Sequence, residues 1–333
     1  MSTGERVVFV GAVHEAAPAL EAVRDSAAAE LVGVVTTPES ASGRLSGAVD
    51  LPGLVDPSVP VLRTEDINAP EHVAWIRGLQ PRLLVVVGWT RLIRDELLAV
   101  PTYGCVGFHA SLLPLHRGRA PVNWSLILGE AETGNTMMLL SPGADTGDIV
   151  DQRRTPIYLD DTCATVYERV GALGADMLSD HLPALLSGTA PRTPQDVTAG
   201  DLMPKRVPAM GVIDWARPPV EVHNWVRAQT APYPGAFTEL DGRKVMVWAT
   251  APPLRSEAAG VSGEVLAVED GIRVGAGGGS VLVTSASWEG ESPAPAAAWA
   301  RETGIGPGTR FTGPDPAVAA WARGEGPRPV AVP

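Results

Sequence analysis

Residues 83–109, LLVVVGWTRLIRDELLAVPTYGCVGFH, contain the pattern that decides the fold class. Leu83–Val87 is a continuous apolar run, typical of a strand buried on both faces of a parallel sheet. Arg94–Val100 then predicts a short helix, and Cys105–His109 predicts the next strand. A strand, a helix and a second strand in this order are typical of an open α/β sheet.

The same alternation extends in both directions from this stretch. Before it, the pattern predicts a strand at Val7–Val10, a helix at Ala16–Ala29 and a strand at Leu31–Thr36. After it, we expect a helix at Pro121–Leu128, a strand at Thr136–Leu140 and a long helix that Asp161 and Thr162 cap and that ends near Leu186. Residues 1–187 are therefore predicted to form a mostly parallel, Rossmann-like α/β domain.

The pattern changes beyond residue 187. Residues 188–206 are rich in Gly, Pro and Thr and are predicted to be a linker. In residues 207–333 we expect a short helix at Pro219–Ala228 and then strands at Ala236–Leu240, Lys244–Ala249, Glu264–Val268, Ile272–Gly275 and Val281–Ser287. The Asp241-Gly242 pair between the first two strands is a hairpin signal. This part is predicted to form a smaller β-barrel domain.

The composition excludes several classes of protein. The 333 residues carry a formal net charge of −12, and Lys205 and Lys244 are the lysines among 26 basic residues, which is a poor electrostatic footprint for a nucleic-acid binder. Cys105 and Cys163 lack metal or disulfide spacing, so we expect buried thiols and no metal. No apolar run approaches the length of a membrane span or a signal peptide, which predicts a cytoplasmic protein with no membrane partner.

Two polar residues are candidates for proton transfer. No GxGxxG or GxxxxGK[ST] pattern is present, so no nicotinamide or nucleoside triphosphate is predicted. His109 follows a predicted parallel strand, and Asp145 lies in the Gly-rich loop PGADTGDI after a later one. A histidine and a carboxylate delivered to one rim of the sheet could act as a proton-handling pair. From spacing alone, a hydrogen-bonded structural pair is the alternative.

The segment around these residues resembles a known family. HASLLPLHRGRAPVNW, then Glu132-Thr133-Gly134, then GADTGDIV are similar to the folate-dependent formyltransferases. The likeness continues into Gly211–Trp215, Val222–Asn224 and Tyr233–Phe237, which resemble the carboxyl-terminal domain of methionyl-tRNA formyltransferases. The resemblance implies the formyltransferase fold with an OB-like second domain, and 10-formyltetrahydrofolate as cosubstrate.

The resemblance also implies roles for individual residues. The family uses an Asn-x-His pair and a distant Asp, so His109 and Asp145 are the expected catalytic residues. Gly107 stands where the family has its asparagine. Because that amide helps to stabilise the oxyanion, its loss puts activity in doubt. We expect that Gly107 either makes room for a larger acceptor or adopts a positive φ that no side chain tolerates.

Two segments are implied to bind the folate, mainly through main-chain groups. They contain Val87, Trp89, Arg91, Leu92 and Ile93 in the first segment, and Ser141, Gly143 and Ala144 in the second. Trp89 could equally be an ordinary core aromatic. For the acceptor, the expected contacts are Ser111, Leu112, Arg117, Arg119 and Asn123. Solvated arginines and a local cap by Asn123 are the alternatives.

The charge pattern leads us to expect a small amine as acceptor and not tRNA. The loop at residues 37–47, where the tRNA enzymes carry a basic insertion, has Arg44 as its sole basic residue, and residues 207–333 hold ten basic and thirteen acidic residues. An amino sugar nucleotide, an amino acid or a natural-product intermediate would fit. Methionyl-tRNA formyltransferase is the second alternative, and a 10-formyltetrahydrofolate hydrolase or a folate-binding protein without transfer is the third. The oligomeric state stays open, with a homodimer as one option.

Overall fold

The computed structural model describes residues 4–43, 45–253 and 260–330. It divides into two compact units, one made of residues 1–121, 132–156 and 167–202 and the other of residues 122–131, 157–166 and 203–333. Residues 122–131 and 157–166 thus group with the second unit, although we expected them in the first domain. Hydrogen bonds within the second unit hold them there, since Asn123 donates to the Ala228 carbonyl at 2.6 Å and His223 to the Leu159 carbonyl at 2.8 Å.

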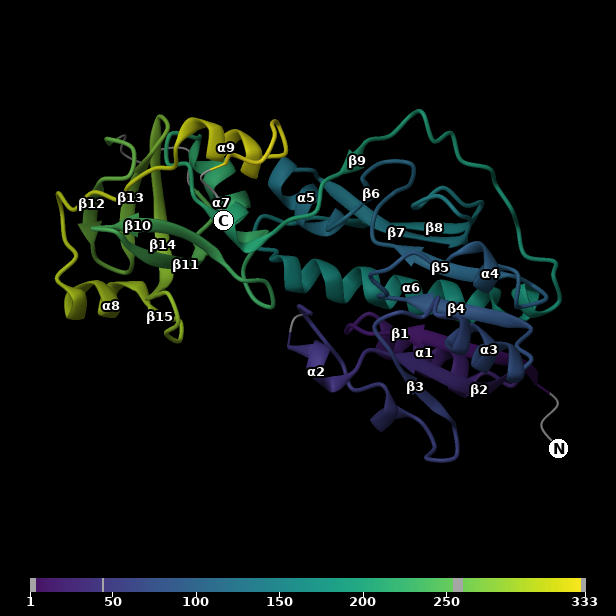
Figure 1. Cartoon of the computed structure of the whole chain (residues 1–333). Coiled ribbons are helices and arrows are strands. Elements are labelled where there is room, and N and C mark those ends of the chain that lie inside the picture. The colour runs from purple at the N-terminus through teal and green to yellow at the C-terminus, as the bar shows by residue number, and fades with distance from the viewer. Residues whose placement is uncertain (1–3, 44, 254–259, 331–333) are drawn as a thin grey trace. The chain divides into compact units, whose positions relative to one another are not determined.

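The first unit is built on a mixed sheet (Figure 1). Within the described residues this sheet has seven strands in the order β3-β2-β1-β4-β5-β7-β8. The strands are β1 Glu5–Gly11, β2 Ala29–Thr36, β3 Val61–Arg63, β4 Leu83–Val87, β5 Cys105–His109, β7 Glu132–Leu139 and β8 Ile149–Pro156. The first five are parallel, while β7 and β8 are antiparallel to their neighbours. The prediction of an open, mostly parallel Rossmann-like sheet is confirmed.

Helices cover both faces of this sheet because side chains alternate along each buried strand. Val7, Phe9 and Val85 pack toward α1 and α6, whereas Val8, Val10 and Leu84 pack toward α3 and α4. The elements are α1 Ala16–Asp25, α2 Glu39–Ser42, η1 Pro52–Leu54, α3 Pro70–Gly78, α4 Asp95–Leu98, α5 Pro121–Leu128 and α6 Cys163–Leu186, with the short strands β6 Arg117–Gly118 and β9 Leu202–Met203. The helix α1 ends at Asp25, four residues before the predicted end.

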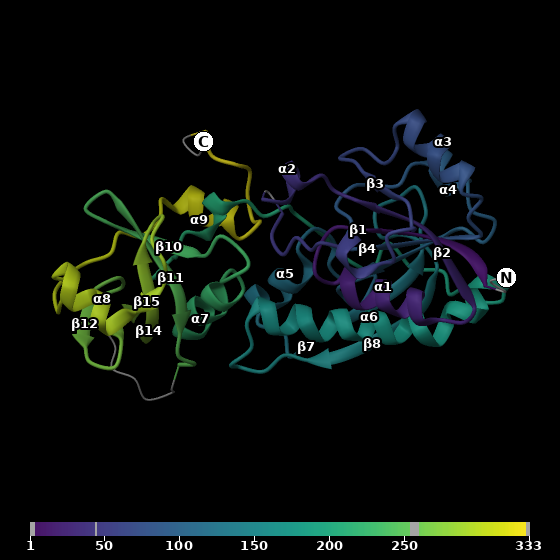
Figure 2. The same ribbon diagram turned by 90° about the horizontal axis from the view of Figure 1, so that it is seen from below.

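The second unit is built on an antiparallel sheet with helices beside it (Figure 2). Its elements are η2 Pro208–Gly211, α7 Pro219–Arg227, β10 Ala236–Leu240, β11 Arg243–Thr250, β12 Val265–Val268, β13 Ile272–Ala276, β14 Gly279–Trp288, β15 Ala294–Pro295, α8 Ala296–Thr303 and α9 Pro316–Ala322. The strand order is β10-β11-β14-β13-β12, and β15 pairs with β14. Thr312 bridges to Glu239 and Arg310 to Glu264, so residues 310–312 link the two edges of the sheet.

Two further features expected from the sequence are present in the structure: the turn at residues 241–242 and the two buried thiols. Asp241 and Gly242 both have positive φ, 50° and 76°, as the two-residue turn between β10 and β11 requires. Cys105 and Cys163 are buried and free, and burial raises the pKa of each thiol to about 12. Among the described residues, no helix is both long enough and apolar enough to cross a membrane.

Candidate active site

His109 is the last residue of β5, and its ring is almost completely buried. The side chain is 8% exposed, and Nε2 lies 2.8 Å from the carbonyl oxygen of His116. A carbonyl only accepts, so this contact places a proton on Nε2. The other ring nitrogen, Nδ1, faces Asp145 and is therefore the atom that can gain or lose a proton.

Asp145 is held in place from its other side. Its Oδ2 accepts a hydrogen bond from the Gly118 main-chain N–H at 2.8 Å, while its Oδ1 lies 3.6 Å from His109 Nδ1. A separation of 3.6 Å is too long for a hydrogen bond but within the distance of an ion pair. The carboxylate and the imidazole therefore face each other at the end of β5.

The two residues meet in a way that the sequence did not indicate. We expected the strands before His109 and Asp145 to end at one rim, but β7 is antiparallel to β5, so His109 pairs with Thr136 and Leu139 pairs with Val106. The loop after β7 therefore starts at the opposite end of β5. It folds back along the strand to bring Asp145 to His109.

The chain fastens this loop at several points. Gln195 Nε2 donates to the carbonyls of Asp145 and Gly147 at 3.2 and 2.6 Å, and the hydroxyls of Ser141 and Thr146 lie 2.9 Å apart. Asp145 itself has φ of 55°. A non-glycine residue in this region is strained, which is a common feature of functional sites. Gln195 was missed because it lies in the predicted linker and no motif marks it.

Gly107 has ordinary strand geometry. It pairs with Val86 and Met138 within the sheet, and it is not among the glycines with positive φ. The expectation of a positive φ is therefore wrong. The constraint is steric instead, because a Cβ at this position would lie 2.5 Å from Leu140 Cδ2. Leu140 fills the space beside His109 into which a side chain at residue 107 would project.

The first proposed folate segment combines buried and exposed residues. Val87 and Ile93 are buried, and Gly88, with φ of 61°, turns the chain after β4. Arg91 lies 3.5 Å from Glu65, and Leu92 is 58% exposed with its carbonyl accepting from Asn68. In the half-buried Trp89, the indole Nε1 is buried without any hydrogen-bond partner. An orphaned donor of this kind suits a ligand that offers an acceptor.

The second proposed folate segment is the loop that carries Asp145. Ser141 and Ala144 are half-buried and Gly143 is exposed. A Cβ at Gly143 would collide with the Thr146 side chain, so the loop needs a glycine there. The residues of both segments fit a folate, since they combine exposed residues such as Leu92 and Gly143 with one unpartnered buried donor, Trp89 Nε1.

Most of the proposed acceptor contacts have structural roles. Ser111 Oγ donates to the Leu115 carbonyl at 2.7 Å, and Arg117 Nη2 donates to the Val197 carbonyl at 2.7 Å. Leu112 packs against Gly134, and Asn123 belongs to the second unit, where its amide is engaged by Ala228. Arg119 alone of this set is exposed. Arg44 lies outside the described residues.

Taken together, the structure shows an α/β fold in which His109 and Asp145 lie together at the carboxyl end of β5, an arrangement typical of α/β enzymes. The family models agree with this class: Formyl transferase matches residues 5–182, and Formyl transferase, C-terminal domain, matches residues 206–304. The chain belongs to the formyl transferase family, and its formyl donor is 10-formyltetrahydrofolate.

Individual relatives support this assignment. The chain is 38% identical to a methionyl-tRNA formyltransferase of Geobacter sulfurreducens, over 92% of this chain and 97% of the relative. It is 35% identical to that of Ruminiclostridium cellulolyticum, over 84% and 90% respectively. Among solved structures, HypX of Aquifex aeolicus in complex with tetrahydrofolic acid matches with a TM-score of 0.63 at 20% identity, covering 91% of this chain and 47% of that one. At this identity the structural likeness shows the fold alone.

These relatives contradict two of our predictions, the small amine acceptor and the absence of a tRNA partner. Relatives that align along most of this chain are methionyl-tRNA formyltransferases. The prediction failed because net charge averages over the whole surface, whereas binding to phosphates depends on a few cations at one place. A net charge of −12 therefore does not exclude a tRNA substrate.

Proposed function

We propose that the protein is a methionyl-tRNA formyltransferase, which transfers a formyl group to the α-amine of methionyl-tRNA. The observation that carries the proposal is the 38% identity to a methionyl-tRNA formyltransferase over 97% of the relative's length. The likeness includes both family domains, at residues 5–182 and 206–304.

His109 and Asp145 are the proposed catalytic residues. 10-Formyltetrahydrofolate supplies the electrophilic formyl carbon when it is bound. His109, buried and fixed by the His116 carbonyl, can carry a proton on Nδ1 toward Asp145. When Nδ1 takes up the proton of the amine, the ring becomes positive, which favours negative charge on a nearby oxygen, and the Asp145 carboxylate faces that charged ring.

Val87, Trp89, Arg91, Leu92, Ile93, Ser141, Gly143 and Ala144 are the proposed folate contacts. Val87 would contribute main-chain groups, Ile93 would contact the apolar edge of the ring system, and Trp89 Nε1 would donate to a polar atom of the ring system. Arg119, which is exposed after the turn that supports Asp145, is the proposed contact for an anionic part of the acceptor. Because Gly107 has no side-chain amide, a group other than residue 107 would have to stabilise the oxyanion.

The test is a direct assay with defined acceptors. The purified protein is incubated with 10-formyltetrahydrofolate and either methionyl-tRNA, uncharged tRNA or free methionine, and the formylated product is measured. We expect product with methionyl-tRNA, none with the other two, and a loss of product in His109→Ala. Formylation of free methionine at the same rate, or release of formate without any acceptor, would refute the proposal.

A further inference from the structure

A small cavity lies in the first unit on the opposite face of the sheet from His109. Its volume is about 10 Å³, and it is lined by Glu15, Ala19, Val87, Phe108, Ala110, Asn135, Gly171 and Gly174. A space of this size holds one water molecule when polar groups surround it. The cavity is separate from the groups that fix the His109 ring.

The cavity contacts the catalytic strand at both neighbours of His109. Phe108 and Ala110 line it, and successive side chains of a strand point to opposite faces. Phe108 belongs to the apolar core beneath α1 and α6. A group that fills the cavity therefore contacts Phe108 and Ala110, the two chain neighbours of His109, and supports the carboxyl end of β5.

Two polar groups face this cavity without partners. Asn135 is 5% exposed, and its Nδ2 donates to the Val170 carbonyl at 2.7 Å, but its Oδ1 is buried with no hydrogen bond. Among the described residues, the Glu15 carboxyl has no hydrogen bond or ion pair either. An unpaired buried acceptor is costly, so a donor is expected between them.

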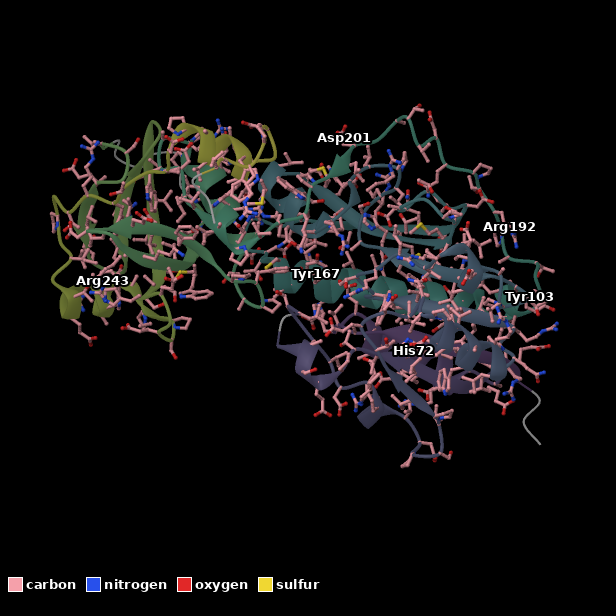
Figure 3. All side chains as sticks on the ribbon, viewed as in Figure 1. His72, Tyr103, Tyr167, Arg192, Asp201 and Arg243 are labelled. Atoms are coloured by element: carbon pink, nitrogen blue, oxygen red, sulfur yellow. The ribbon has the colours of Figure 1, made fainter. Side chains whose placement is uncertain are left out.

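The surroundings of Glu15 favour its neutral form. The other lining residues, on α1, β4, β5, β7 and α6, are not titratable. His14 precedes Glu15 in the chain, and its ring contacts that of Tyr167 on α6 edge to face, with the ring centroids 5.8 Å apart. Tyr167 is labelled in Figure 3. Glu168, also on α6, is exposed. Part of Glu15 reaches the surface, yet desolvation raises the pKa of its carboxyl to about 7.

We propose that Glu15 is a positioning residue, whose neutral carboxyl donates to a single water that also donates to Asn135 Oδ1 and so supports the end of β5 behind His109. The protonated acid donates its O–H to the water, and the water in turn donates to Asn135 Oδ1, the buried acceptor without a partner. When the carboxyl ionises, it brings an uncompensated charge to the cavity, and water must enter to solvate it. The support under Phe108 and Ala110 is then weakened, and with it the alignment of His109 and Asp145.

The sign of the pH effect follows from the raised pKa. Because folded Glu15 holds its proton more tightly than the unfolded chain, its contribution to stability is complete below the ordinary glutamate pKa of 4.5. This contribution decreases as the pH rises to about 7, and above that pH the stability no longer changes on account of Glu15. Glu15→Gln, which copies the shape of the neutral acid, should remove this pH dependence.

The experiment compares the wild type, Glu15→Gln and Glu21→Gln, a matched control at an exposed position of α1. Thermal unfolding is measured from pH 4.5 to 9. We expect the melting temperature of Glu15→Gln, relative to the wild type, to rise up to about pH 7 and then level off, while Glu21→Gln follows the wild type. Parallel curves for Glu15→Gln and the wild type would overturn the proposal.

The second readout is the pH profile of kcat and KM for formyl transfer, which rests on the proposed function. As the pH rises above about 7, we expect the kcat of the wild type to fall relative to that of Glu15→Gln. The decrease should not exceed ~10²-fold, the loss of rate that a misplacement of about 1 Å causes in other enzymes. If the melting temperatures of Glu15→Gln and the wild type depend on pH in the same way, the inference is overturned even when formyl transfer is found. If they differ as expected but no formyl transfer is found, the proposed function is refuted instead. If Glu15→Gln does not fold, infrared titration of the wild type reports the carboxyl directly, and complete ionisation of every glutamate by pH 6 overturns the proposal.

Discussion

The side chain of Leu140 occupies the space that any side chain at residue 107 would need. A Cβ on Gly107 would lie 2.5 Å from Leu140 Cδ2 and 3.1 Å from Leu140 Cγ, on the same face of β5 as His109. The two positions are therefore coupled. The proposed catalytic histidine is bordered here by an aliphatic group at the place where the resemblance implies an amide.

The first prediction follows from this coupling. Gly107→Asn alone should lower transfer, because overpacking at Leu140 costs about 1–3 kcal/mol and displaces the new amide. Gly107→Asn with Leu140→Ala should transfer faster than either single variant, since the amide then has room; ~10²–10³-fold is the scale that such a donor reaches in other enzymes. Single-turnover rates for the four proteins decide this. A large gain from Gly107→Asn alone would show that Leu140 moves freely.

The second prediction concerns the catalytic pair. His109→Ala and Asp145→Ala should each reduce kcat by ~10²–10⁴-fold, the range typical of positioned proton-transfer groups. The double variant should be no slower than the slower single one, because the residues act as a unit. His72→Ala on α3 is the matched control and should retain the wild-type rate (Figure 3). Near-normal rates in both single variants would mean that the pair is structural.

The sequence predicts best what the core determines. Leu83–Val87 and Cys105–His109 are strands with the predicted bounds, since continuous apolar runs have no alternative to full burial. Ile149–Pro156 was missed because it is a polar edge strand with few buried residues. The helix at Pro70–Gly78 was missed because, of its residues, only Val73 and Ile76 are fully buried, with Trp75 partly buried against the same core.

The site was predictable as a set of residues but not as a geometry. The resemblance drew attention to His109 and Asp145, which do lie together. Neither the antiparallel direction of β7 nor the contact between Gly107 and Leu140 has a local sequence signal, since both depend on pairing between distant segments. Gln195 was missed for the same reason.

The third prediction tests the folate segment through its orphaned donor. Trp89→Phe keeps most of the ring but removes the indole N–H, which is buried without a partner. If a bound folate accepts from it, the variant should bind tetrahydrofolate about 2–10-fold more weakly, as one net hydrogen bond of ~0.5–1.5 kcal/mol implies. Trp299→Phe is a matched control, because its Nε1 is also buried and unpartnered but lies in the second unit. Calorimetric titration of both variants makes the comparison, and equal affinity in Trp89→Phe and the wild type would remove Trp89 from the site.

The last prediction concerns the acid sensitivity of the second unit. His223 is 3% exposed; its Nε2 donates to the Leu159 carbonyl at 2.8 Å, and its Nδ1 lies 2.8 Å from Thr250 Oγ1. In this arrangement the neutral ring donates once and accepts once, so protonation of Nδ1 would replace the acceptor with a second donor.

Desolvation by burial, together with nearby Arg227, lowers the pKa of His223 below its ordinary value of 6.5, although the hydrogen bond to Leu159 opposes the shift. The unfolded chain therefore binds this proton more readily than the folded one. The stability that His223 contributes is present above pH 6.5 and is lost as the pH falls from there through the folded-state pKa. His223→Gln, which cannot gain a proton, should be less stable than the wild type at pH 8, and the difference should shrink as the pH falls below 6.5. Urea unfolding at a series of pH values measures this, with His72→Gln, on α3 of the first unit, as the control. A difference that stays constant from pH 8 to pH 5 would show that His223 is not protonated on unfolding in this range.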